Sequence, residues 1–154
     1  MSSDGFDAGE LIEFSQLLKR DLLLGLAYLN ERVPHRFTAV NQFDGDLIRN
    51  VHVYDKQGQV MPKHIKPVAM GDSFCQFVAR DGHFLSCDTA EDVRLDGHRH
   101  QGNYNAYVGV PILDNVNKLW GTLCHLDLVS QTVTDQEFDF LQRASGVLSR
   151  HLKF

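Results

Sequence analysis

The chain has 154 residues, of which 43% are hydrophobic and 23% are charged, and its 15 basic and 20 acidic side chains give a formal net charge of −5. This length suits one domain, the mildly acidic surface does not favour nucleic acid or an anionic membrane as a partner, and no apolar run reaches the roughly 18 residues of a membrane span. Three cysteines are too few for a disulfide scaffold and the first ten residues lack the features of a signal peptide, so we expect a cytoplasmic domain.

The first 34 residues are predicted to form a tail and one helix. Residues 1–8 are small and polar and are typical of a flexible tail, which leaves residues 9–154 as a single domain. From Leu11 onward, apolar residues recur at steps of three and four, as in a helix, and Pro34 ends this pattern. The apolar stripe is wider than the about 100° that one packed face requires. The helix therefore either lies deep in the protein or presents a second face to a partner.

A hairpin and a loop follow the helix. The runs 36–43 and 47–54 contain β-branched and aromatic residues, and the turn-forming sequence Asp44-Gly45-Asp46 joins them. These two runs are predicted to pair as antiparallel strands. Residues 60–72 contain two prolines and a glycine, so they are predicted to form a loop with at most one short extended piece.

Short elements occupy the middle of the chain. Ser73 is placed to cap a helix over residues 74–80, and residues 83–87 have the composition of a short strand. The segment 89–102 is polar and rich in turn-forming residues, with room for one helical turn. We therefore expect a short helix, a strand and a loop to follow one another here.

Two longer strands and a helix complete the chain. Residues 105–113 and 119–128 are predicted strands, and Pro111 suits a strand end or an edge position. Thr134, with Glu137 three residues later, forms a capping box, which predicts a helix to the C-terminus. Because two connections are too short for a crossover, the sheet is expected to be mostly antiparallel, with five or six strands. The fold class is therefore α/β, of the α+β kind.

Four short motifs resemble those of the GAF domain, the small-molecule sensor module common in bacterial signalling proteins. They are Asp72-Ser73-Phe74-Cys75, Asp88 within residues 86–92, the run 107–112 and the run 120–127. Their order is similar to that in GAF domains found ahead of histidine kinases and diguanylate cyclases, and the resemblance covers about residues 11–152. The resemblance implies a GAF/PAS-like fold, with terminal helices on one face of the sheet and a short helix and loops roofing a pocket on the other.

The resemblance also places a ligand pocket between the sheet and residues 60–102. Five residues are candidates for its lining, namely Phe74, Cys75, Phe84, Asp88 and Tyr107. Gly109 and Gly121 lie inside predicted strands, where glycine costs packing unless another group approaches closely. We therefore expect a close approach at both glycines. A closed pocket of this kind is the usual geometry for a small ligand.

Thiol chemistry is the main catalytic alternative. One enzymatic branch of the GAF fold reduces free methionine sulfoxide with a cysteine in the loop ahead of the strand equivalent to residues 105–113. The corresponding loop here, residues 98–103, has no cysteine, and Cys75 alone matches a cysteine position of that branch. Cys75 and Cys124 are predicted to be buried structural residues, whereas Cys87 is more exposed. We therefore assign no catalytic residue.

No cofactor is assigned from the sequence. The pair Cys124-His125 resembles a bilin attachment site, but phytochrome-like GAF domains carry that pair one strand earlier. His98 and His100 with Asp96 have a borderline metal-ligand composition without a second paired motif, and no axial haem motif is evident. Four further histidines are predicted to be scattered on the surface, namely His35, His52, His64 and His151.

The resemblance implies a stand-alone, non-catalytic sensing or interaction domain in bacterial signal transduction. The expected partners are an unknown small molecule and either a second copy or a helical signalling protein, which would carry the output. An exposed surplus of apolar residues on the terminal helices often marks such a surface. The candidate interface residues are Leu22, Leu26, Phe140 and Leu148. The alternatives are a thiol redox enzyme of the methionine sulfoxide kind and a degenerate domain with a filled pocket that serves to dimerise.

Overall fold

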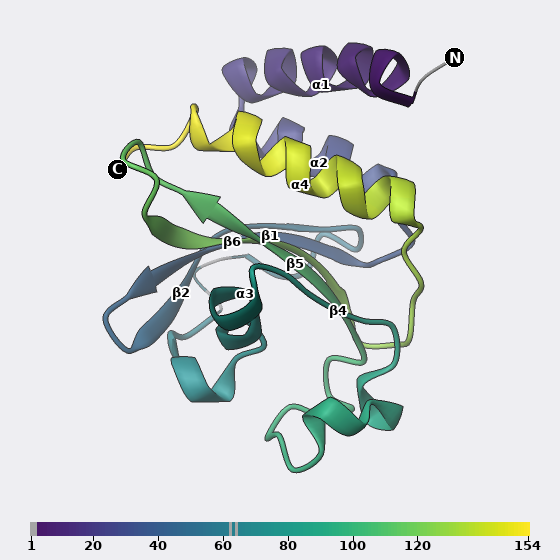
Figure 1. The fold of residues 1–154 in the computed structure, drawn as a ribbon, viewed down its shortest axis with the longest axis vertical. Coiled ribbons are helices and arrows are strands. Elements are labelled where there is room, and N and C mark those ends of the chain that lie inside the picture. The colour runs from purple at the N-terminus through teal and green to yellow at the C-terminus, as the bar shows by residue number, and fades with distance from the viewer. Residues whose placement is uncertain (1–2, 62, 64) are drawn as a thin grey trace.

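The computed structural model describes residues 3–61, 63 and 65–154, which fold around a twisted antiparallel sheet (Figure 1). Among these residues the sheet has six strands, in the order β3-β2-β1-β6-β5-β4. The strands are β1 (Phe37–Asp44), β2 (Leu47–Asp55), β3 (Val68–Ala69), β4 (Phe84–Ser86), β5 (Ala106–Leu113) and β6 (Leu119–Asp127). The helices are α1 (Ser3–Arg20), α2 (Leu22–Glu31), α3 (Cys75–Asp81) and α4 (Asp135–Ser149), with 3₁₀ turns η2 (Met70–Asp72), η3 (Thr89–Glu91) and η4 (Val93–Leu95). This architecture confirms the α+β class and the antiparallel pairing.

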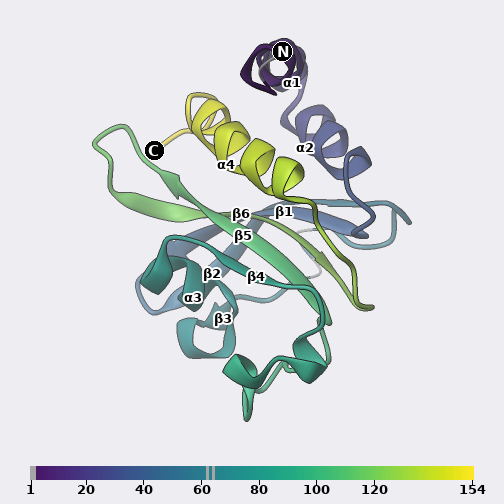
Figure 2. The ribbon, with the colours of Figure 1, turned by 45° about the vertical axis from the view of Figure 1, so that its right-hand side comes forward.

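The two faces of the sheet are covered differently. Figure 1 shows α2 and α4 against one face, with α1 as an outer layer over them, and Figure 2 shows α3 and the neighbouring loops on the opposite face. Each face has its own apolar core. The core on the helical side consists of Phe14, Leu18, Leu26, Leu29, Val40, Val108, Val110, Ile112, Leu123, Phe140, Leu141, Ala144 and Leu148. The core on the other side includes residues of α3, β4 and β5.

The N-terminal helical segment differs from the prediction in two respects. We expected residues 1–8 to precede the helix, but α1 begins at Ser3, because extending an existing helix costs little. The single long helix is instead two helices that meet at Asp21, whose backbone is extended and whose carboxylate accepts a hydrogen bond from the Leu23 N–H at 2.9 Å. The chain turns at this point, so α1 packs on α2 and α4 instead of on the sheet.

The outer helical layer changes the assignment of the dimer candidates. Leu26, Phe140 and Leu148 are at most 1% exposed, because α1 contributes to the apolar cluster that encloses them. These three residues belong to the core of the single chain, so the prediction that they form a dimer surface is wrong. Leu22 is partly buried. Among the residues of α1 and α2 whose burial is described, the exposed large apolar side chains are Ile12, Leu23 and Leu24.

Arg32, directly after α2, joins the three helices of this face. Its guanidinium donates to Glu137 at 2.9 and 3.0 Å and forms a close ion pair with Glu10. The same group lies 3.6 Å from the centre of the Phe140 ring. Because Glu10 belongs to α1 and Glu137 to α4, this one largely buried side chain fixes the outer helix on the inner pair.

Close approaches account for the two strand glycines, as predicted. A Cβ on Gly121 would lie 1.9 Å from the Asn41 carbonyl oxygen of the neighbouring strand, and a Cβ on Gly109 would lie 2.4 Å from the Tyr107 hydroxyl. The Tyr107 ring therefore lies in the space that Gly109 leaves open. Pro111 follows the point where pairing between β5 and β4 stops, at Gly109, so it occupies a locally free edge of β5.

Replacing Thr134 with alanine should lower the free energy of unfolding by about 1 kcal/mol. The Thr134 hydroxyl accepts a hydrogen bond from the Glu137 N–H at 3.1 Å at the start of α4, as the capping box predicts, and alanine would leave that N–H without its partner. Urea denaturation followed by circular dichroism measures the change. The control is Thr132→Ala, an exposed residue ahead of the helix, which should change stability by less than about 0.5 kcal/mol. Equal losses in the two variants would contradict the capping role.

Candidate ligand-binding cavity

A cavity of about 380 Å³ lies between the sheet and the segments on its α3 side. Nine strand residues form the cavity floor, namely Phe37, Ala39, Asn41, Ile48, Asn50, Val53, Tyr107, Cys124 and Leu126. The roof comes from two irregular segments, from the short strand β3 with the following η2, and from the start of α3, through Val60, Ile65, Val68, Asp72, Ser73, Phe74, Cys75, His100 and Tyr104. Arg36, Lys66 and Leu128 complete the lining. The volume is within the range of roughly 300–1,000 Å³ that small-ligand pockets occupy.

Three of the five candidate residues line this cavity, namely Phe74, Cys75 and Tyr107. Phe84, on β4, is buried behind them, and its ring packs against those of Phe74 and Phe77 with centres 6.4 and 4.8 Å apart. Asp88 follows β4 and does not belong to the lining. Its Oδ1 is buried and accepts no hydrogen bond within the described part of the chain.

The local sequence around α3 places the roof residues. The Ser73 hydroxyl accepts a hydrogen bond from the Cys75 N–H at 2.9 Å, but the N-cap of α3 is Phe74, one residue later than predicted. Gly82 ends it with a left-handed backbone, φ +83°, and donates its N–H to the Val78 carbonyl at 2.8 Å. This single short helix holds Cys75 against the sheet.

Thiol and hydroxyl groups meet at the cavity floor. Cys75 Sγ lies 3.4 Å from the Tyr107 hydroxyl and 3.2 Å from Thr122 Oγ1. Burial raises the pKa of Cys124 and of Tyr107 well above the ordinary values, and the nearby Cys75 raises both pKa values further. Both groups therefore stay protonated near pH 7. All three cysteines are free thiols, with Cys75 and Cys124 buried and Cys87 exposed, as predicted.

Two asparagines lie side by side on the cavity floor. Asn41 and Asn50 are cross-strand partners of β1 and β2, next to a β-bulge. Asn50 Nδ2 donates to Asn41 Oδ1 at 3.0 Å and to the His52 carbonyl at 3.3 Å. Asn50 Oδ1 is buried and accepts no hydrogen bond from any residue that the structure describes. The sequence analysis missed this pair, although asparagine is depleted in strands and two facing asparagines are a signal.

Two charged groups of the lining already have counter-ions. Arg36 donates two hydrogen bonds to Asp55, at 2.8 and 3.0 Å, and the Asp55 side chain is 1% exposed. Asp72 pairs with Arg99 at 3.3 Å near the surface. Lys66 is exposed. The charged groups therefore surround a floor whose nine residues are uncharged near pH 7.

The histidines of the segment 98–100 pack as part of the roof. His98 lies with its ring centre 4.8 Å from that of Phe74, and burial, followed by the neighbouring His100, lowers its pKa. His98 Nδ1 accepts a hydrogen bond from the His100 N–H at 3.0 Å. Within the described residues no three metal-ligating side chains gather at one place. His64, predicted on the surface, falls outside the described residues.

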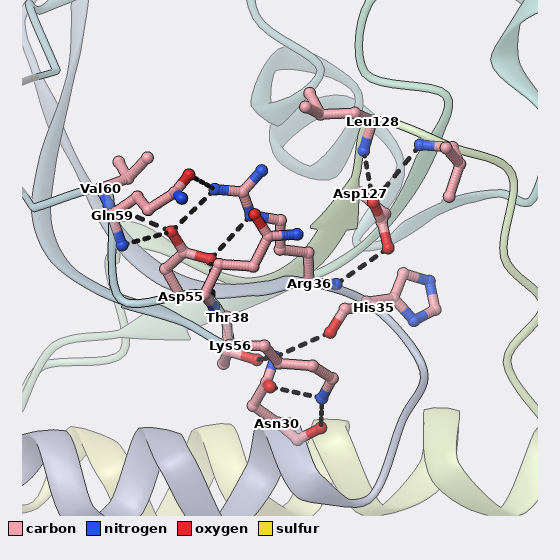
Figure 3. Close-up of polar contacts among 12 residues, drawn as sticks. Asn30, His35, Arg36, Thr38, Asp55, Lys56, Gln59, Val60, Asp127 and Leu128 are labelled. Carbon is pink, nitrogen blue, oxygen red and sulfur yellow. Dashed lines mark hydrogen bonds and ion pairs between the residues drawn. The ribbon is translucent and has the colours of Figure 1, made fainter.

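A polar network connects the cavity with the end of α2 (Figure 3). Asp55, which holds the cavity-lining Arg36, also accepts hydrogen bonds at 3.0–3.1 Å from three backbone N–H groups within residues 57–60. The next residue, Lys56, donates from Nζ to the Asn30 carbonyl at 2.7 Å and to Asn30 Oδ1 at 2.5 Å. Asn30 lies in the last turn of α2. A continuous set of contacts therefore runs from the cavity wall to the helical layer.

Two buried histidines lie beside this network. His35, predicted on the surface, is only 1% exposed, because the turn between α2 and β1 packs it near His125, which is 2% exposed. Their ring centres are 5.9 Å apart, and His125 Nδ1 lies 2.7 Å from Thr38 Oγ1. Burial lowers the pKa of His35 to about 4, with Asp127 opposing and Lys56 adding to the shift. Burial, then His35 and Lys56, lowers the pKa of His125 to about 3.

Solved structures of similar fold come from proteins of different kinds. The GAF domain of an Acinetobacter phosphoenolpyruvate-protein phosphotransferase is 15% identical, with a TM-score of 0.73 over 98% of this chain and 93% of that chain. The free methionine-R-sulfoxide reductase of Neisseria meningitidis, in complex with its substrate, is 13% identical, with a TM-score of 0.71 over 98% and 90%. The chromophore-binding domain of an unusual bacteriophytochrome from R. palustris is 12% identical, with a TM-score of 0.70 over 93% and 60%. At these identities the similarity establishes the fold.

Comparison of the sequence with curated proteins and with family models gives different results. No curated protein is significantly similar in sequence to this chain. In the described part of the chain, no helix is both long and apolar enough to cross a membrane. The model of the GAF domain matches residues 20–152, from the end of α1 to beyond α4, and so includes the whole sheet and the cavity. The chain belongs to the GAF domain family.

Proposed function

We propose that this chain is a non-catalytic, small-molecule-sensing domain of bacterial signal transduction that acts in the cytoplasm. The observation that carries the proposal is the cavity of about 380 Å³, with apolar and aromatic walls and a few polar groups on its floor. This combination is typical of sites that bind a small organic ligand. The signal would pass to a partner chain or to a second copy.

The chemistry of the floor supports binding over catalysis. A nucleophilic cysteine reacts as the thiolate, and the buried Cys124 has a raised pKa that keeps its proton. Cys75 contacts the Tyr107 and Thr122 hydroxyls, neither of which is a base near pH 7. The segment 98–103, which would carry the nucleophile in the methionine sulfoxide branch, has no cysteine.

The polar network gives the proposed signal a physical route. Arg36 lines the cavity, Asp55 holds Arg36, and Lys56 binds the end of α2. A ligand that moves Arg36 would therefore act on contacts that also position the helical layer. This continuous series of contacts supports the proposal. Energetic coupling between the cavity and the helical layer is a separate quantity that only an experiment measures.

Reduction of methionine sulfoxide is the second candidate. Its support is the similarity of the fold to a free methionine-R-sulfoxide reductase and the position of Cys75 in the cavity lining. Incubation with free methionine sulfoxide and a dithiol reductant tests it directly. Turnover by the wild type that is lost in Cys75→Ser would establish the enzyme and reject the non-catalytic proposal.

Quinoline, an uncharged bicyclic probe, should bind this cavity with a Kd of about 1 mM, as expected for a fragment of about ten heavy atoms. Amide NMR titration should show saturable shifts at cavity residues such as Phe74 and Tyr107. Val68→Trp, in the lining, should fill part of the cavity and weaken binding about tenfold or more. The control Val116→Trp, 65% exposed, should not change it. Absence of saturable shifts at the cavity would reject the sensor proposal and favour a filled, dimerising domain.

A further inference from the structure

We infer that the cavity binds an organic monocarboxylate with an aromatic body, and that the free edge of the Arg36 guanidinium binds its carboxylate. The inference rests on the proposed binding function and specifies its ligand class. Three observations carry it, namely the position of the guanidinium over the cavity floor, its unused N–H groups and the positive charge balance of the lining.

The Arg36 guanidinium lies on the cavity side of the sheet. Its Cζ is 4.6 Å from the centre of the Phe37 ring, and Phe37 belongs to the cavity floor. Figure 3 shows the guanidinium on the opposite side of the strands from the helices at the bottom of the view. The Arg36 side chain is 16% exposed, so part of it is accessible to a ligand. This positive group therefore faces the cavity and not the helical layer.

Two of the five N–H groups of this guanidinium have no acceptor in the described part of the chain. Nε donates to Asp55 at 2.8 Å, and Nη2 donates to Asp55 at 3.0 Å and to Gln59 Oε1 at 3.1 Å. The third nitrogen, Nη1, is turned away from both of these partners (Figure 3). A ligand oxygen at Nη1 would therefore gain a charge-assisted hydrogen bond without breaking an existing contact.

The guanidinium is fixed in place before a ligand binds. Asp55, which holds it by two hydrogen bonds, is itself held by three backbone N–H groups within residues 57–60 and is 1% exposed. An arginine that is already ordered loses little side-chain entropy when it binds an anion. The free Nη1 edge is therefore a preorganised donor.

The charge balance around the cavity favours a monoanion. Among the described lining residues and their ion-pair partners, three groups are positive, Arg36, Lys66 and Arg99, and two are negative, Asp55 and Asp72. Lys66 is exposed and pairs with no carboxylate that the structure describes. With histidines counted as neutral, the site has one excess positive charge, although the whole chain carries −5. One carboxylate neutralises this charge, whereas a phosphate dianion would leave a negative charge uncompensated.

The rest of the cavity suits an aromatic body. Phe37, Phe74 and Tyr107 contribute rings to the lining, and none of the nine floor residues is charged near pH 7. A planar ring gains apolar contact and ring stacking against such side chains. An apolar body and a single carboxylate therefore match the two parts of the lining, the uncharged floor and the basic groups around it.

Three naphthalene probes test the inference by NMR titration at pH 7.5. 2-Naphthoate carries the carboxylate, 2-naphthamide is its uncharged counterpart of similar shape, and 2-naphthyl phosphate carries a dianion. We expect 2-naphthoate to bind the wild type about tenfold more tightly than 2-naphthamide, as one charge-assisted hydrogen bond would give. The phosphate should bind more weakly than 2-naphthoate. The Nε–H signal of Arg36 should shift with 2-naphthoate and stay in place with 2-naphthamide.

Two substitutions assign the preference to the basic groups. Arg36→Lys keeps a positive partner for Asp55 but removes Nη1, and it should reduce the preference for 2-naphthoate to about twofold or less. Lys66→Gln should lower the affinity for 2-naphthoate about threefold, as expected for an exposed charge, and should not change that for 2-naphthamide. The matched control, Lys118→Gln in the exposed turn between β5 and β6, should change neither affinity. If Arg36→Lys does not fold, the wild-type series and Lys66→Gln decide.

The outcomes separate the ligand class from the proposed function. Equal affinities of 2-naphthoate and 2-naphthamide in the cavity would overturn the inference and leave the sensor proposal standing. A preference that both Arg36→Lys and Lys66→Gln retain in full would overturn it as well. Tighter binding of 2-naphthyl phosphate would reject the monocarboxylate class. Absence of saturable shifts with all three probes would reject the proposed function itself.

Discussion

Replacing Asp55 with alanine should lower the free energy of unfolding by about 4 kcal/mol. The Asp55 carboxylate is 1% exposed and accepts two hydrogen bonds from Arg36 and three from backbone N–H groups within residues 57–60 (Figure 3). Arg36 and then these N–H groups hold the pKa of the carboxyl well below its ordinary value, although burial opposes them. Alanine would leave a largely buried guanidinium and three N–H groups without their acceptor, which is far more costly than losing an exposed ion pair.

The matched control is Asp44→Ala. Asp44 also pairs with an arginine, Arg49, at 2.5 Å, but the two side chains are 54% and 47% exposed. This substitution should cost less than about 1 kcal/mol, because solvent screens exposed pairs. Urea denaturation of the wild type and both variants at pH 7.5 measures the difference. Losses of similar size in the two variants would show that the buried carboxylate has no special structural role.

Elements with local signals were predictable from the sequence. The hairpin over residues 36–54 follows from strand-forming runs around a Gly-containing turn, and the start of α4 follows from the capping box at Thr134. The break at Asp21 was not predictable in this way, because apolar periodicity continues across it. The turn there is stabilised by the packing of α1 on α2 and α4, which is a tertiary effect that a local pattern does not contain.

The cavity was only partly predictable, because its lining comes from distant segments. The family motifs pointed to Phe74, Cys75 and Tyr107, and these residues do line it. Asn41 and Asn50 escaped notice because they face each other only in the register that the β-bulge after Val40 creates. The polar network raised the same difficulty, since the sequence does not show that its residues converge from α2, β2 and β6. His35, which lies beside this network, therefore resembled a surface residue.

Lowering the pH from 7 to 5 should reduce the free energy of unfolding by about 4 kcal/mol through His35 and His125. Their pKa values are about 4 and about 3 in the folded chain, against roughly 6.5 when unfolded. At pH values between the folded and the unfolded pKa values, the unfolded chain binds two protons that the folded chain does not. The stabilising contribution of the neutral imidazoles is therefore complete above pH 6.5, and it falls by about 1.4 kcal/mol per histidine for each pH unit below that value.

Urea denaturation at pH 7, 6 and 5 isolates this effect when variants are compared with the wild type. His35→Phe and His125→Gln should each remove about half of the pH-dependent loss, whatever their effect at pH 7, because each removes one of the two titrating rings. The exposed His83→Gln should keep the full loss. The pKa of His52 is also lowered by burial, so the difference between variants, and not the total slope, identifies the pair. Asp55, with its lowered pKa, loses its contribution only below about pH 4, outside this window. A slope unchanged in both histidine variants would show that neither ring is held neutral by the fold.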